Sequence, residues 1–351
     1  MRKFLLILLL SLLLVSAASV FAQDNTTLTV VTHDSFAVSE EILSQFEAET
    51  GITVRILRSG DAGTMVNQSI LSKSNPLGDV MYGIDNTFLS RALDAELFIP
   101  YESPLLNTVR EEFLIDDAHR VTPVDFGDVC LNYDVAFFTE NNLPVPQTLR
   151  DLTDPIYKGM LVVENPANSS PGLAFLLATI AEFGEAGDYT YLDFWADLVE
   201  NDVFVSDDWS DAYFAQFTVP SGGVGSRPLV VSYASSPPAE VLFAEETPDT
   251  APTASIVADG TCFRQVEFVG ILDGTEHVEA AQQFVDFMLS REFQEDMPLQ
   301  MFVFPVIEDA ALPDVFEEYA LIPENPSLLT IEQIDENREA WIMAWAEVVL
   351  R

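Results

Sequence analysis

The sequence predicts an α/β protein with two lobes. Apolar strand-like segments near the amino end alternate three times with amphipathic helices, and a second run of the same kind begins at Met160. This alternation is typical of parallel sheets whose strands are joined by helical crossovers. Two long extended segments, 122–133 and 262–269, separate the runs. We interpret them as crossings between two sheets, so that the second lobe is an insertion in the first.

The first lobe is expected to contain three strands that end at a common edge. The strands are expected at 28–32, 52–57 and 79–83, and the first helix at 39–49 ends at Gly51. Polar residues follow each strand. Because ligands bind at the carboxyl ends of the strands in open α/β sheets, this edge is a candidate binding site.

The second lobe begins with a strand at 160–164 and an apolar helix at 173–183. Ser169 or Ser170 is the expected cap of that helix. Its free first-turn N–H groups could hold an anion, although an ordinary capped helix is the commoner meaning of this pattern. A helix at 189–200 follows.

Two short strands in the second lobe each lead into a helix. The strand at 203–206 precedes Ser210, the expected cap of a helix at 211–217. The strand at 229–233 precedes Ser236, and Pro237 suits a first helical turn.

Aromatic residues gather at these helix starts. Trp209, Tyr213 and Tyr233 offer flat apolar faces at the edge where the strands end. Each alone could cover a small core, but the three together favour a binding cleft.

The same patterns give the predicted boundaries of the lobes. The last third of the chain is expected to contain helices at 276–289 and 331–350. We expect a discontinuous first lobe at 27–126 and 266–310, a second lobe at 127–265 with hinge strands at both ends, and a C-terminal helical segment at 311–351.

Residues 1–22 are predicted to form a secretory signal peptide. Arg2 and Lys3 precede an apolar run from Phe4 to Val15, and a cleavage site follows Ala22. The run is too short for a comfortable membrane span, and no later stretch approaches the required length. We therefore expect a soluble periplasmic or extracellular protein without direct membrane insertion.

The chain is strongly acidic, with 15 basic and 57 acidic residues and a net charge of −42. This charge disfavours nucleic acid and anionic membranes as partners. An acidic surface keeps an exported protein soluble, and the same field would also steer cationic ligands inward. We favour solubility as the main role of the charge.

Little in the sequence indicates catalysis or metal binding. His33, His119 and His277 are far apart, and none has a carboxylate or cysteine at the spacing of metal ligands. The pair Asp207 and Asp208 is better explained as a solvated turn than as a catalytic dyad. The two cysteines form either one disulfide or two buried free thiols.

The mature chain resembles the type II periplasmic solute-binding proteins of ABC importers, and among them the thiamine-binding proteins. The resemblance rests on motifs that occur in the same order at similar spacing over nearly all of residues 28–351. They are Thr32-His33-Asp34-Ser35-Phe36, Gly83-Ile84-Asp85-Asn86, Ser170-Pro171-Gly172-Leu173, Trp209-Ser210-Asp211-Ala212-Tyr213, Ser232-Tyr233-Ala234-Ser235-Ser236-Pro237 and the helix from Arg338 to Trp345.

This resemblance implies two lobes, with mostly parallel sheets, that close on thiamine or its phosphate esters as a transported ligand, without a cofactor or a metal. It implies permease subunits as partners, no enzymatic activity and, we expect, a monomer. It also places Cys130 and Cys262 on adjacent hinge strands, which favours a disulfide. The ligand-binding residues implied by matching positions are His33, Asp34, Asp61, Ala62, Asp85, Ser169, Ser170, Trp209, Tyr213, Tyr233 and Phe302.

Three positions depart from the family pattern. His33, Ala239 and Phe302 stand where relatives carry Tyr, Tyr and Trp, so the aromatic enclosure is thinner. The alternatives are a polyamine, a ferric ion or another small solute in the same fold. Iron would call for adjacent tyrosines, which Tyr233 lacks. A further alternative is an exported enzyme that uses the carboxylates of Asp61 or Asp85.

Overall fold

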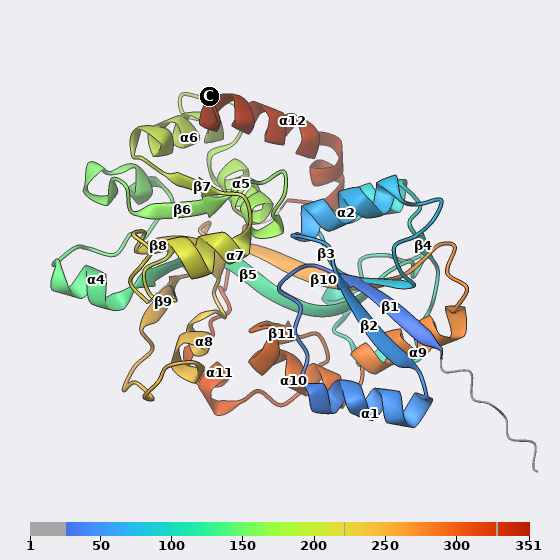
Figure 1. Cartoon of the computed structure of the whole chain (residues 1–351). Helices are drawn as coiled ribbons and strands as arrows, with labels where there is room; N and C mark the ends of the chain where they lie inside the picture. Colours follow the sequence, from blue (N-terminus) through green and yellow to red (C-terminus); the bar gives the residue numbers. More distant parts are fainter. Residues whose placement is uncertain (1–25, 221, 328) are drawn as a thin grey trace, which may run out of the picture.

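A computed structural model describes residues 26–220, 222–327 and 329–351. The expected signal peptide lies outside the described residues. In the described part of the chain, no helix has the length and apolar character needed to cross a membrane. Figure 1 shows two lobes, joined by the strands β5 and β10, and confirms the α/β prediction.

The strands form one mixed sheet in the order β2-β1-β3-β10-β5-β8-β6-β7, with β4, β9 and β11 paired at its sides. The two predicted sheets are therefore two parallel portions of one hydrogen-bonded network. The strands are β1 (Thr27–Thr32), β2 (Thr53–Arg58), β3 (Val80–Asp85), β4 (Phe98–Ile99), β5 (Thr122–Asp134), β6 (Leu161–Glu164), β7 (Phe204–Ser206), β8 (Leu229–Tyr233), β9 (Thr253–Ile256), β10 (Phe263–Leu272) and β11 (Phe304–Pro305).

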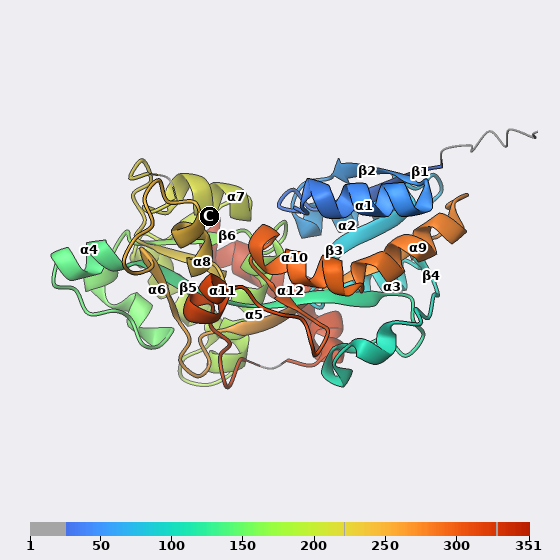
Figure 2. The same cartoon turned by 90° about the horizontal axis from the view of Figure 1, so that it is seen from below.

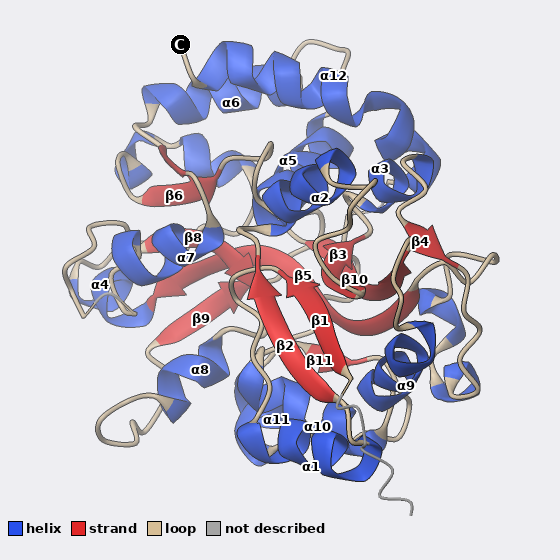
Figure 3. Cartoon of the chain, turned by 45° about the vertical axis from the view of Figure 1, so that its right-hand side comes forward, coloured by secondary structure: helices blue, strands red, loops and turns tan. Residues whose placement is uncertain are grey.

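Helices surround this sheet, as Figure 3 shows. They are α1 (Glu40–Thr50), α2 (Ala62–Leu71), α3 (Leu89–Asp94), α4 (Val135–Glu140), α5 (Ser170–Phe183), α6 (Tyr191–Glu200), α7 (Trp209–Asp211), α8 (Pro237–Leu242), α9 (Val278–Met288), α10 (Arg291–Gln300), α11 (Asp314–Tyr319) and α12 (Ile331–Val349). Short 3₁₀ turns occur at Leu106–Thr108, Glu111–Phe113, Arg150–Thr153 and Pro155–Tyr157.

The first lobe contains the parallel strands β1, β2 and β3, and the second contains β6, β7 and β8, which are also parallel. Between them, β5 and β10 pair antiparallel with each other, and each pairs antiparallel with one lobe's strands. Figure 2 shows the two lobes from below. The predicted crossing segments are therefore confirmed as the connection between the lobes.

Local sequence signals place several helix ends. Ser39 caps α1 by accepting the N–H of Ile42, and Gly51 ends the helix with a left-handed φ of 73°. One prediction is wrong. Ser210 lies inside α7, which is capped by Asp208, whose carboxylate accepts the N–H of Asp211. The chain then continues as a π-helical turn, Ala212–Gln216, instead of an α-helix.

A disulfide joins Cys130 in β5 to Cys262, which immediately precedes β10. Both residues are buried, and the neighbouring register pairs Phe263 with Val129. The hinge strands are thus side by side, as the family resemblance implies, and the alternative of two free thiols is wrong.

The closing helix α12 contacts both lobes. Trp345 packs edge to face on Trp195 of α6, with ring centroids 5.5 Å apart. At the other end, Arg338 donates hydrogen bonds to the carbonyl of Thr87 and the hydroxyl of Ser90 in the first lobe. Trp195 is a core residue, and α12 is a second physical link between the lobes.

Replacing both cysteines with alanine should lower the free energy of unfolding by up to about 5 kcal/mol. The disulfide closes a loop with a sequence separation of 132, and it therefore restricts the unfolded chain strongly. Urea unfolding of the oxidised wild type and the double variant measures this difference. An unchanged unfolding midpoint would show that the bridge does not stabilise the fold.

Candidate ligand-binding cleft

A cavity of about 310 Å³ lies between the two lobes. Its walls come from the carboxyl ends of β1 and β8, the starts of α2, α5 and α7, and the loop before β11. This volume lies within the range of sites for small organic molecules. All the residues expected to bind the ligand line the cavity, except Asp85 and Ser169.

The second lobe contributes an aromatic wall. The rings of Trp209 and Tyr213 stack with centroids 4.9 Å apart and an interplanar angle of 18°. The indole N–H of Trp209 donates to the hydroxyl of Ser232, and Tyr213 donates to a carboxylate oxygen of Glu240 at 3.0 Å. These bonds hold both rings in position. The π-helical turn brings Phe214 to the same wall, which the sequence did not indicate.

The first lobe contributes Asp61 at the start of α2. One oxygen of Asp61 accepts the N–H of Ala62, and the other accepts the N–H of Trp209 from the second lobe at 3.2 Å. Nearby, the N–H of Gly63 donates to the carbonyl of Asn168 across the same gap. The lobes are therefore in contact beside the cavity.

The floor of the cavity contains an ion pair between His33 and Glu267, whose Nε2 and Oε1 atoms are 3.3 Å apart. Burial alone would lower the pKa of His33, but the Glu267 carboxylate outweighs it and raises this pKa. His33 fits only because Gly83 has no side chain. A Cβ at Gly83 would lie 2.1 Å from the imidazole, and its φ of 93° also favours glycine.

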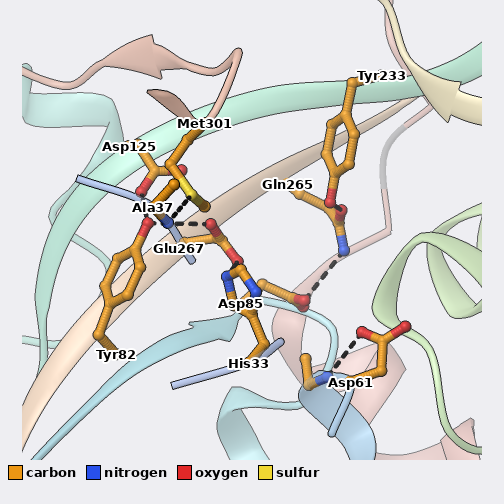
Figure 4. Close-up of polar contacts among 11 residues, drawn as sticks. His33, Ala37, Asp61, Tyr82, Asp85, Asp125, Tyr233, Gln265, Glu267 and Met301 are labelled. Atoms are coloured by element: carbon orange, nitrogen blue, oxygen red, sulfur yellow. Dashed lines mark hydrogen bonds and ion pairs between the residues drawn. The ribbon is translucent and has the colours of Figure 1, made fainter. Parts of the chain in front are cut away.

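Below the floor, Glu267 belongs to a buried set of acidic groups on the hinge strands (Figure 4). The Tyr82 hydroxyl donates to Asp125 at 2.5 Å and also lies 3.2 Å from a carboxylate oxygen of Glu267. Burial, reinforced by the adjacent Glu267 charge, raises the pKa of Asp125 well above its usual range. Burial opposes ionisation of Glu267 as well, but His33 outweighs it and lowers this pKa. These opposite directions favour a neutral Asp125 beside a charged Glu267.

Asp85 lies behind the cavity wall. Its carboxylate accepts hydrogen bonds from the backbone and the hydroxyl of Thr87, and from the side-chain amide of Gln265 at 3.0 Å. Gln265 in turn accepts the hydroxyl of Tyr233 at 2.9 Å. Asp85 thus supports a cavity residue through Gln265 and does not itself line the cavity. Burial raises its pKa to about 6.

Ser169 also lies outside the cavity. It is the N-cap of α5 and is fully buried, whereas Ser170 and Pro171 reach the lining. The side chain of Ser169 makes no capping hydrogen bond. Of the two predicted serines, Ser170 is the one at the ligand space.

Phe302 lines the cavity and contacts Phe243 of the second lobe. Their ring centroids are 5.7 Å apart in an edge-to-face arrangement. Phe302 has a φ of 55°, which is uncommon for an aromatic residue. Phe243, Glu240 and Glu267 also line the cavity and were missed. Only the pairing of β10 with β5 and the folding of 237–243 bring them there, so no local signal could have identified them.

Metal binding finds no support in the geometry. Across the described ranges, no group of three or more histidine, cysteine, aspartate or glutamate side chains could hold a metal ion. Three carboxylates in or behind the cavity wall accept hydrogen bonds from side chains: Glu267 from Tyr82, Glu240 from Tyr213 and Asp85 from Gln265.

Comparison with known proteins identifies the family. The model of the bacterial extracellular solute-binding protein family matches residues 75–325. The chain belongs to this family. The family description places the protein outside the cytoplasm, in agreement with the predicted export.

Individual relatives match over nearly the whole chain. The thiamine-binding periplasmic proteins of Salmonella typhimurium and Escherichia coli are 29% and 28% identical, and each match covers 97% of this chain and 98% of the relative. A solved structure of a periplasmic thiamin binding protein superposes with a TM-score of 0.79 at 26% identity, covering 93% of this chain and 97% of that one. These relatives are named as binding proteins, not as enzymes.

The raised pKa of Asp85 predicts a pH-dependent cost to stability. Because burial disfavours the charged form, the native protein loses stability as the pH rises through the interval from the unfolded pKa of 3.8 to the folded value of about 6. Relative to Asp85→Asn, the wild type should lose up to about 3 kcal/mol of unfolding free energy between pH 4 and pH 7.

Urea unfolding at several pH values measures this difference. Asp188→Asn, which removes an exposed carboxylate, is the matched control and should follow the wild type. Parallel pH profiles for the wild type and Asp85→Asn would contradict the assignment.

Proposed function

We propose that this protein captures thiamine, or a phosphate ester of it, in the cleft between the lobes and delivers it to the permease of an ABC importer. The observation that carries the proposal is the stacked pair Trp209 and Tyr213 on a cavity that also contains carboxylates. Thiamine joins a permanently positive thiazolium ring to an aminopyrimidine ring. Aromatic faces attract such a cation, and carboxylates accept hydrogen bonds from an amino group.

The positions of the carboxylates support this assignment. Asp34, Asp61, Glu240 and Glu267 line the same cavity. One carboxylate oxygen of Asp61 accepts the N–H of Trp209, so Asp61 connects these carboxylates to the aromatic wall. We propose that the ligand lies between these carboxylates and the aromatic wall. The expected site residues would surround it, except Asp85 and Ser169, which do not line the cavity.

The contacts across the cleft support capture by closure. The bonds from Trp209 to Asp61 and from Gly63 to Asn168 form only when the lobes approach each other. Hinge closure around a ligand is a common mechanism in two-lobed binding proteins. We propose that the lobes have the boundaries 27–126 with 266–310 and 127–265, that 311–351 bridges them, and that the protein acts as a monomer.

Thiamine should bind the mature protein with one-to-one stoichiometry, and Trp209→Ala should weaken binding by about 3- to 30-fold. This range corresponds to the loss of one cation–π contact of about 0.5–2 kcal/mol. Isothermal titration measures the affinity. Tryptophan fluorescence provides a second readout, because Trp195, Trp341 and Trp345 are buried away from the cavity whereas Trp209 lines it.

Trp341→Phe is the matched control, since it removes a buried tryptophan that does not line the cavity. It should leave thiamine affinity and the ligand-induced quenching unchanged. A folded wild-type protein that binds spermidine but not thiamine would overturn the thiamine assignment in favour of a polyamine receptor. Turnover of a substrate that stops in Asp61→Asn would favour the enzyme alternative.

A further inference from the structure

Negatively charged side chains outnumber positively charged ones in the described lining of the cavity. Four carboxylates line it, from Asp34, Asp61, Glu240 and Glu267, and no lysine or arginine does so within the described chain. The imidazole of His33 is the one cationic group in the lining, and it is already paired with Glu267. None of the ion pairs among the described residues involves Asp34, Asp61 or Glu240.

The helix start that could hold a phosphate faces carboxylates. Ser170 and Pro171 at the start of α5 line the cavity, and Pro171 has no N–H to donate. Burial raises the pKa of Asp85 and of Asp61, and hydrogen bonds from the hydroxyls of Ser170 and Ser169, respectively, oppose this rise, so each hydroxyl lies close to one of these carboxylates. These two carboxylates of the first lobe therefore occupy the surroundings in which an anionic ligand would otherwise be stabilised by the helix end.

Glu240 adds negative charge to the opposite wall. Glu240 lies in the first turn of α8 and is partly buried. It accepts a hydrogen bond from Tyr213, which stacks on Trp209. Both residues of this aromatic wall are therefore bonded to a carboxylate, Tyr213 to Glu240 and the backbone of Trp209 to Asp61. Because like charges repel more strongly near a protein than in bulk water, a phosphate group beside these carboxylates would be destabilised.

We propose that the cleft selects the unphosphorylated cation and discriminates against its phosphate esters. This inference rests on the proposed function and narrows it to one ligand form. A phosphate monoester brings about two negative charges, without a lysine or arginine in the lining to pair with them. The net charge of −42 acts in the same direction at longer range, since it slows the approach of anions.

Isothermal titration of the mature protein with thiamine and thiamine monophosphate at pH 7.5 tests this proposal. We expect the monophosphate to bind at least about tenfold more weakly, with a preference that decreases at high salt. In Glu240→Gln, thiamine should bind more weakly and the monophosphate more strongly, so that the ratio of their dissociation constants falls by about threefold or more. Glutamine still offers an oxygen to Tyr213, which preserves the wall.

Glu185→Gln removes an equal charge from an exposed residue that does not line the cavity and should leave the ratio unchanged. Equal affinities for thiamine and the monophosphate would overturn the selectivity while leaving the proposed function intact. The same holds if Glu240→Gln weakens both ligands by the same factor, because this indicates only a structural role. Failure of both ligands to bind a folded sample would overturn the proposed function itself.

Discussion

The antiparallel pairing of β5 with β10 is the constraint on which the rest of the structure depends. These strands connect the parallel portions of the sheet, and three side-chain links cross between them or their ends. The disulfide Cys130–Cys262 is one link, and the two-bond ion pair of Arg264 with Asp128 is another. The third is Asp125 beside Glu267, which are also register partners. Together these links fix the relative position of the two strands.

The same pairing positions residues that line the cavity. Glu267 reaches the cavity floor from β10, and Gly127 of β5 allows Tyr233 to pack against the backbone, where a Cβ would lie 2.7 Å from the ring. This arrangement buries several acidic side chains. Burial raises the pKa of Asp125 and so favours its neutral form, Glu267 is paired with His33, and Asp85 accepts a hydrogen bond from Gln265. The hinge and the site are therefore parts of one polar network.

Sequence reasoning predicted the elements whose signals are local. Apolar runs located the strands, and the Ser39 and Gly51 signals bounded α1 correctly. It failed at Ser210, because Asp208 is the N-cap of α7. It also failed at the π-helical turn, which depends on the packing of Tyr213 and Phe217 against Val230 of β8. It did not identify Glu240 or Glu267. Their roles depend on chain segments far apart in sequence, such as the contact of Glu267 with His33, and such pairings have no local pattern.

The central claim is that the two lobes close about this pair of strands when the ligand binds. Small-angle X-ray scattering of the mature protein, with and without saturating thiamine, tests this claim most directly. The liganded protein should give a scattering curve that matches the present structure, in which Asp61 contacts the N–H of Trp209 across the cleft. The free protein should have a larger radius of gyration. Identical curves under conditions in which thiamine is demonstrably bound would contradict closure about the hinge strands.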